Sequence, residues 1–253
     1  MLLSTAFFPP RSWFAAAAED WGRLVATNPC SVCDVFLDAM EPYRKQSYRN
    51  RCIIAAAGGP EAISVPVVHD GDIYRQMVAS IRVDYSDGWV KKAERAVESA
   101  YSGAAFFEFY RDDIFAILDS GIPTLWDLNL AIINYFIDKI HLGIRIVPLR
   151  ETVSPDPVRF AHPSHRKRWA PPTHVAVGGT PPGGDSFPEG ERDYREVIHP
   201  KKGNAILREL GLEKPYFQVF AGKYGFKADL SIMDLLFNEG PQSLLYLVNP
   251  SNL

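Results

Sequence analysis

The pattern that most constrains the fold is an apolar run, an amphipathic segment and a second apolar run within the first 38 residues. Leu2–Ala6 is predicted to form a buried strand, which ends at Phe7-Phe8-Pro9-Pro10. Ser12 is expected to cap a helix that runs to about Ala26 and has an apolar inner face of Phe14, Ala17, Ala18, Trp21 and Val25. Val32–Leu37 predicts a second strand, which ends in Asp38. Strand, helix and strand with short joints make a βαβ unit, which favours a parallel pair and a right-handed crossover.

A β-hairpin is predicted directly downstream. Cys52–Ala57 and Ala62–Val67 are short β-rich runs, and Gly58-Gly59-Pro60 between them supplies the positive φ angles that a tight turn needs. We therefore expect an α/β or α+β fold. The βαβ unit and the hairpin would form a mixed sheet, covered by helices from the middle and the end of the chain.

The middle of the chain is predicted to be mainly helical. Ile81–Asp84 predicts a short strand, Asp87 caps a helix to about Ala100, and Ser102 or Gly103 opens another helix. Thr124 and Asp127 form a capping box for a helix that ends at Gly143. Ile144–Leu149 follows as a strand.

The C-terminal part carries a second capping signal. Tyr216–Phe220 is apolar enough for a strand or a short helix, and a helix is predicted to begin near Asp229 with a Ser231/Asp234 capping box. Asn238-Glu239-Gly240 closes that helix, and Pro241 opens a final one.

Residues 152–192 differ in kind from the rest. They are rich in proline and glycine and have almost no periodic apolar pattern, which is typical of a lid, an insertion or a disordered segment. We expect one domain over residues 1–253 that contains this insertion.

The composition argues against several classes of protein. A formal net charge of −3 argues against bulk nucleic-acid binding. No apolar window is long enough for a transmembrane helix, and the N-terminus does not read as a signal peptide. Three cysteines do not suit a disulfide framework and fit a reducing cytoplasm. Cys30-Ser31-Val32-Cys33 favours two small residues entering a strand, with a zinc or redox site as the alternative.

The loop before the hairpin is dense in groups that can hold an anion. Arg44, Lys45, Arg49 and Arg51 alternate with the polar or aromatic residues Tyr43, Gln46, Tyr48 and Asn50. Residues two apart on a strand share a face, so Arg49 and Arg51 would hold a phosphate or carboxylate together while Asn50 faces away. The alternative is a solvated basic loop, in which Tyr43 and Tyr48 pack the hairpin instead of stacking on a sugar or base.

Several blocks taken in order resemble the WbqC-like family. They are 43–52 (Tyr-Arg-Lys-Gln-Ser-Tyr-Arg-Asn-Arg-Cys), 65–67 (Val-Pro-Val), Trp89 with 98–101, 106–110 (Phe-Phe-Glu-Phe-Tyr) and 230–241 (Leu-Ser-Ile-Met-Asp-Leu-Leu-Phe-Asn-Glu-Gly-Pro). The resemblance implies a setting near bacterial surface-polysaccharide (O-antigen) synthesis and modified sugars. Many members carry His-Gln-Pro at the end of the first strand, where this chain has Ser4-Thr5-Ala6-Phe7-Phe8-Pro9-Pro10, so a role for that histidine does not carry over. The matched polar residues that remain are Arg49, Asn50, Arg51, Asp234, Asn238 and Glu239.

These features predict a cytoplasmic transferase that moves an acyl or aminoacyl group onto a nucleotide-linked amino sugar or a similar small amine. The chain has no glycine-rich phosphate loop, no serine nucleophile elbow and no zinc-type cluster. We expect no resident cofactor or metal. A phosphate-bearing donor such as acyl-CoA, an aminoacyl donor or a nucleotide sugar would bind, and carrier or biosynthetic enzymes are the expected partners. The alternative is a non-catalytic binding or scaffold protein of a biosynthetic complex.

Transfer to an amine needs a proton acceptor within hydrogen-bond reach, and the candidates are Asp38, Glu239 and His199. Each also has a structural interpretation. Asp38 would cap a turn, Glu239 and Asn238 would tie a helix end to the core, and His199 would lie on the surface. We expect the basic loop, Asp38 and Phe7–Arg11 to surround one crevice, because ligands bind at the carboxyl ends of parallel strands.

Overall fold

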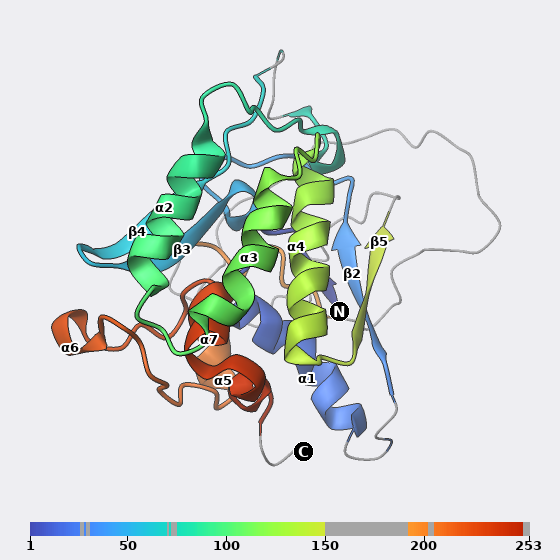
Figure 1. Cartoon of the computed structure of the whole chain (residues 1–253). Helices are drawn as coiled ribbons and strands as arrows, with labels where there is room; N and C mark the ends of the chain where they lie inside the picture. Colours follow the sequence, from blue (N-terminus) through green and yellow to red (C-terminus); the bar gives the residue numbers. More distant parts are fainter. Residues whose placement is uncertain are drawn as a thin grey trace.

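The structure is a computed structural model, and it describes residues 1–25, 28, 31–69, 71, 75–149, 192–201 and 205–249 (Figure 1). The predicted insertion at 152–192 lies outside the described residues, apart from Arg192. Cys30, the first cysteine of the CxxC pattern, also lies outside them.

A parallel three-stranded sheet confirms the predicted βαβ unit. Its strands are β1 (Leu2–Leu3), β2 (Cys33–Asp38) and β5 (Ile144–Leu149), in the order β1-β2-β5, and α1 (Arg11–Val25) packs on β2 and β5. β1 is shorter than predicted, because the Ser4 carbonyl accepts a hydrogen bond from the Trp13 indole N–H (2.9 Å) instead of from a neighbouring strand. The chain therefore leaves the sheet at Ser4.

The hairpin is confirmed, but it stands apart from the parallel sheet. It consists of β3 (Arg51–Ala56) and β4 (Gly59–Ser64), joined by a turn at residues 57 and 58. The predicted mixed sheet is wrong in this detail, because the outer edge of β3 is already occupied. Ile53 O accepts a hydrogen bond from Ser231 N (2.8 Å), and Ala55 N donates to the Tyr101 hydroxyl (3.3 Å).

Three helices fill the middle of the molecule. They are α2 (Trp89–Tyr101), α3 (Phe107–Asp119) and α4 (Leu125–Ile140); α2 contacts β3, and α3 packs on both α2 and α4. In Figure 1 the hairpin and the parallel sheet lie on opposite sides of the α3–α4 pair. Thr124 caps α4 as predicted, accepting from Asp127 N (3.0 Å).

Residues 81–84 do not form the predicted strand. They make two isolated bridges, Val67↔Val83 and Arg82↔Thr124, directly after the 3₁₀ turn η3 (Val78–Ser80). Their bridge partners lie in separate segments, so no continuous ladder forms.

The C-terminal elements are short and anchor the N-terminal half. They are α5 (Ile206–Glu209), α6 (Ala221–Tyr224), α7 (Ile232–Glu239) and the 3₁₀ helix η5 (Gly240–Tyr246). Residues 216–218 have no regular structure and 219–220 form a turn, so 216–220 is neither a strand nor a helix. The carboxylate of Asp229 caps α1, accepting from Ser12 N (2.8 Å) and the Ser12 hydroxyl (2.9 Å), so Ser12 does not cap the helix itself.

One hydrophobic cluster joins the sheet, the hairpin and the helices. Phe7 and Phe8 belong to it. Their rings meet edge-on at 4.7 Å, and Phe8 also meets Phe136 of α4 at 6.0 Å. Among the described residues, no helix has both the length and the apolar character needed to cross a membrane.

Candidate functional site

A small hollow opens at the carboxyl end of β1. Its walls are residues 3–6, Trp13 of α1, Tyr48 and Arg49 of the 3₁₀ turn η1 (Tyr48–Asn50), and Tyr194, Arg195 and Ile198. The hollow measures about 260 Å³ when the part open to solvent is included, and its enclosed part has room for about one water-sized group. The carboxyl ends of parallel strands are where open α/β sheets place their ligands.

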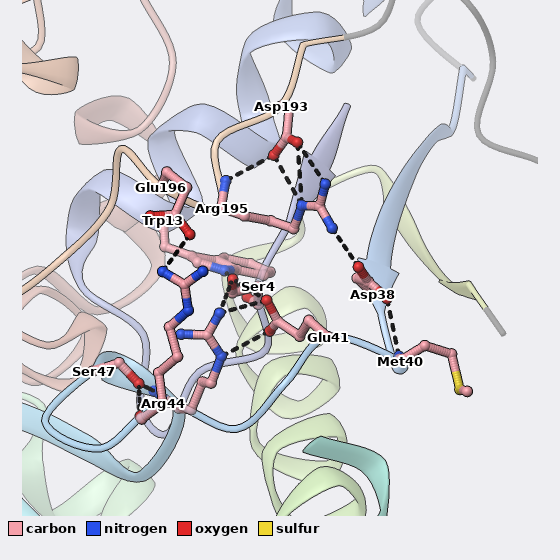
Figure 2. Close-up of polar contacts among 11 residues, drawn as sticks. Ser4, Trp13, Asp38, Met40, Glu41, Arg44, Ser47, Asp193, Arg195 and Glu196 are labelled. Carbon is pink, nitrogen blue, oxygen red and sulfur yellow. Dashed lines mark hydrogen bonds and ion pairs between the residues drawn. The ribbon is translucent and has the colours of Figure 1, made fainter. Parts of the chain in front are cut away.

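The first half of the site is a buried ion pair that holds a serine. Arg49 Nε donates to Glu41 Oε1 (2.9 Å), and Nη2 donates both to Glu41 Oε2 and to Ser4 Oγ (2.9 Å). The Ser4 hydroxyl in turn donates to Glu41 Oε2 (2.9 Å; Figure 2). Only 4% of Arg49 and 6% of Glu41 is exposed, so the pair is shielded from water on nearly all sides.

The second half of the site comes from the far end of the chain. Leu2 N donates to Arg192 O (2.8 Å) and Tyr194 N donates to Leu2 O (2.9 Å), which sets the segment after the insertion beside β1. There Arg195 donates through Nη2 to Asp193 Oδ2 (2.7 Å) and through Nη1 to Asp38 Oδ2 (Figure 2). Asp38 Oδ1 accepts from Met40 N (2.9 Å), so this carboxylate also caps a turn.

Carboxylates outnumber guanidiniums in this network. Glu41 pairs with Arg49, while Asp38 and Asp193 share Arg195; all five side chains are buried, and of the five only the two arginines line the hollow. Burial raises the pKa of Asp38 to about 6; Arg195 opposes this rise and Glu41 adds to it. Ionised Asp38 therefore leaves the network with an excess negative charge.

Two polar groups on the wall of the hollow are not engaged. Thr5 Oγ1 is buried and has no hydrogen-bond partner in the part of the chain that the structure describes. Arg49 makes its bonds through Nε and Nη2, and Nη1 makes none with the described residues. Buried polar atoms in native proteins are nearly always paired, so the Thr5 hydroxyl is an exception, which it shares with Trp89 Nε1, Asn129 Oδ1, Asp234 Oδ1 and Asn238 Oδ1 among the described residues.

The structure does not bring Arg49 and Arg51 together. Ser47 Oγ accepts from Arg49 N (3.4 Å) and caps η1, so Arg49 lies in a 3₁₀ turn and not on a strand. Arg51 begins β3, and its Nε donates to Ser64 Oγ (3.1 Å) on the exposed side of the hairpin. The prediction that both share one strand face is wrong, because the turn reorients the chain between them.

The other loop residues that were predicted to bind the substrate lie in different places: the core, the wall of the hollow, the base of the hairpin and the exposed surface. Tyr43 is buried in the core with 1% exposed, whereas Tyr48 lines the hollow. Asn50 Nδ2 donates to Val65 O (3.0 Å), which closes the base of the hairpin. Lys45 and Gln46 are exposed, and Lys201 Nζ donates to Gln46 Oε1.

The remaining predicted residues do not line the hollow. His199 Nδ1 accepts from Lys201 N (3.1 Å) one residue beyond Ile198, and Glu239 accepts from Phe217 N (3.2 Å) at the end of α7. Phe7–Arg11, expected at the crevice, also lies away from its wall: Phe7 and Phe8 are in the core, and Arg11 Nη2 donates to Tyr246 O (3.0 Å).

Asp234 does not cap α7 as predicted. Its carboxylate is buried and hydrogen-bonded within the protein. Its Oδ2 accepts from the Tyr216 hydroxyl (2.6 Å) and Gln218 Nε2 (2.7 Å), while Asn238 Nδ2 donates to its backbone carbonyl (2.7 Å). Burial raises the pKa of Asp234 to about 6. Ser231 alone caps α7, accepting from Met233 N (3.3 Å).

Five residues of the site escaped sequence reasoning as candidates: Ser4, Thr5, Glu41, Asp193 and Arg195. Ser4 and Thr5 carried one usable signal, since two hydroxyl residues end an otherwise apolar strand. Within the part of the chain that the structure describes, no group of three or more His, Cys, Asp or Glu side chains could hold a metal ion.

Comparison with known proteins assigns the chain to a family. The chain is 27% identical to the "Uncharacterized protein Rv1507c" of Mycobacterium tuberculosis (strain ATCC 25618 / H37Rv) over 214 residues, which cover 84% of this chain and 86% of that protein. No solved structure matches the chain. The family pattern of the WbqC-like proteins matches residues 30–157, a segment that contains Asp38, Glu41 and Arg49 and makes up half of the chain. The chain belongs to the WbqC-like protein family.

Proposed function

We propose that this protein is a transferase that moves an acyl or aminoacyl group onto the amine of a nucleotide-linked amino sugar or a similar small amine. The observation that carries the proposal is the buried network behind the wall of the hollow, in which three carboxylates are paired with two guanidiniums. An ammonium group brought to this hollow balances the excess negative charge. A phosphate there would add to it.

The proton chemistry of the network supports the same reaction. An amine must lose its proton before it attacks an acyl group, and a group that titrates near neutral pH is suited to accept it. Asp38, with its pKa raised to about 6 by burial, changes its charge in this range, but Arg195 lies between it and the wall of the hollow, so Asp38 acts through the charge of the network and not as the direct acceptor. We assign Asp38 the role of setting the charge of the hollow.

The phosphates of the substrates have a separate place in this proposal. The enclosed part of the hollow has room for about one water-sized group, so this proposal places the nucleotide outside it. The loop that supplies Tyr48 and Arg49 continues into exposed Lys45 and Gln46, and Lys201 reaches Gln46. These residues are our candidates for holding the phosphates. The reaction would take place in the cytoplasm, where a buried thiol such as Cys52 stays reduced.

The test compares two ligands that differ only in the reacting group. A nucleotide-linked amino sugar should raise the melting temperature at pH 7.5 more than the same nucleotide sugar with a hydroxyl in place of the amine. With acyl-CoA or an aminoacyl donor added, mass spectrometry should detect the amide product. Equal melting shifts for the two ligands would contradict amine recognition. Amine-selective binding without product from any donor would favour the non-catalytic binding or scaffold role instead.

A further inference from the structure

We propose that Ser4 is the nucleophile of a two-step transfer and carries the acyl group as a serine ester, with Glu41 as its base. The inference rests on the proposed function insofar as an acyl group is the one transferred. It adds a covalent intermediate and names the residues that form and stabilise it. Neither Ser4 nor Glu41 is a candidate from sequence motifs, because no nucleophile elbow surrounds Ser4.

The pairing of Ser4 with Glu41 has the geometry of an activated nucleophile. The Ser4 hydroxyl donates to Glu41 Oε2 at 2.9 Å, within the range in which a base takes the proton of an attacking hydroxyl. Two further bonds from Arg49 fix the Glu41 carboxylate, so its position does not depend on a flexible side chain. Ser4 itself is partly exposed and lines the hollow, so an acyl carbon can reach its Oγ.

The hollow also offers donors for the oxygen that becomes negative during attack. Arg49 Nη2 donates to Ser4 Oγ (2.9 Å), so it stabilises the serine oxygen as its proton leaves, whereas the oxyanion forms on the carbonyl oxygen and needs other donors. Arg49 Nη1 makes no hydrogen bond with the described residues and Arg49 lines the hollow; Thr5 lines it too, and its fully buried Oγ1 has no partner among the described residues. Donors that are already in place for a developing oxyanion are among the largest contributions to acyl-transfer catalysis.

With a thioester as the acyl donor, the bonds and protons balance in both steps. In the first step, the Ser4 Oγ–carbon bond forms and the carbon–sulfur bond breaks; the serine proton passes to Glu41 and then to the leaving thiolate. In the second step, the neutral amine attacks the ester, so that the carbon–nitrogen bond forms and the carbon–Oγ bond breaks. The proton lost by the amine passes through Glu41 to Ser4 Oγ. No oxidant, reductant or metal is consumed.

A purely structural network would not need the unpaired hydroxyl. If Ser4 served only to complete the bonds of Arg49 and Glu41, a valine at position 5 would pack equally well and leave no buried oxygen unsatisfied. The Thr5 hydroxyl therefore separates the two interpretations. Removal of this hydroxyl should cost no stability in either interpretation, but it should slow the labelling of Ser4 only if the hydroxyl takes part in the reaction.

The experiment uses a fluorophosphonate probe, which labels activated serines whatever the physiological donor is. Mass spectrometry should find the full-length protein labelled at Ser4, with the Oγ–phosphorus bond formed and fluoride released. Ser4→Ala should abolish labelling, and Ser86→Ala, which changes an exposed serine, should leave it unchanged. Glu41→Gln should slow labelling on the order of 100-fold. Thr5→Val should slow it at least about tenfold while the melting temperature stays the same or rises.

The outcomes separate this inference from the proposed function. Labelling at Ser4 without acyl transfer to any amine would uphold the nucleophile and remove the proposed substrate class. Amide formation that survives in Ser4→Ala would uphold the transferase and overturn the nucleophile. A folded wild-type protein that is not labelled at Ser4, or a Thr5→Val variant labelled at the wild-type rate, would also overturn the inference.

Discussion

The guanidinium of Arg49 is bound through two of its nitrogens by a buried carboxylate, whereas the guanidinium of Arg51 lies at the protein surface. The two side chains therefore contribute differently to the free energy of unfolding. Arg49 is 4% exposed and paired with Glu41, whereas Arg51 reaches only Ser64 on the open side of the hairpin. Removing one partner of a buried pair leaves the other charge without compensation. The two arginines, identical in type and two positions apart, should therefore respond differently to the same substitution.

Arg49→Ala should lower the free energy of unfolding by about 3–5 kcal/mol, because Glu41 is left buried and unpaired. Arg51→Ala should lower it by less than about 1 kcal/mol, because its hydrogen bond is exposed to water. Denaturant unfolding of the two variants measures the difference. Similar small losses in both variants would contradict the buried ion pair.

Sequence alone could not distinguish these two residues. The basic loop identified the right neighbourhood, since Tyr48 and Arg49 do line the hollow. Which arginine turns inward depends on Ser47, whose hydroxyl donates to Arg44 O (2.6 Å) and caps the turn that carries Arg49. A single 3₁₀ turn of three residues leaves no periodic pattern from which to predict it.

At the scale of elements, local signals predicted well and distant ones did not. The βαβ unit and the hairpin could be predicted, because apolar periodicity and turn residues specify them within short stretches. The Thr124 cap lies beside its own helix and was also predictable. The cap of α1 was not, because Asp229 lies 217 residues from Ser12.

Gly143 shows how an element boundary can be assigned for the wrong reason. The pattern predicts it as the residue that ends a helix, but α4 ends at Ile140, and His141 takes the left-handed conformation (φ 57°). A Cβ on Gly143 would lie 2.1 Å from Trp21 Nε1, so glycine is required there for the packing of α1 against the start of β5.

Gly143→Ala should therefore lower the free energy of unfolding by roughly 1–3 kcal/mol, through overpacking against the Trp21 indole. Gly58→Ala, in the hairpin turn, is the matched control. A Cβ there meets nothing within 4 Å, so the change should stay within about 0.5 kcal/mol. Thermal unfolding of both variants tests this, and equal melting temperatures would contradict the close contact.

At the scale of the whole molecule, the site joins segments that lie far apart in the sequence. Asp38 and Arg195 are separated by 157 residues, and the whole proline- and glycine-rich stretch lies between them. Because this pairing depends on how residues 192–195 align beside β1, no local pattern could predict it. Half of the charge network was therefore out of reach of sequence reasoning, although Asp38 itself could be chosen from its position at the end of a strand.

The excess negative charge at the hollow is the central claim, and the pH dependence of amine binding tests it most directly. Since the pKa of Asp38 is raised to about 6, this carboxyl is mostly protonated at pH 5 and ionised at pH 7.5, while a substrate ammonium stays charged at both. Calorimetry with a nucleotide-linked amino sugar should therefore show affinity up to about tenfold higher at pH 7.5 than at pH 5. Asp38→Asn should lose this dependence, and the hydroxyl analogue should not show it. An affinity for the amine that is equal at the two pH values in the wild-type protein, or a dependence that persists in Asp38→Asn, would contradict the account.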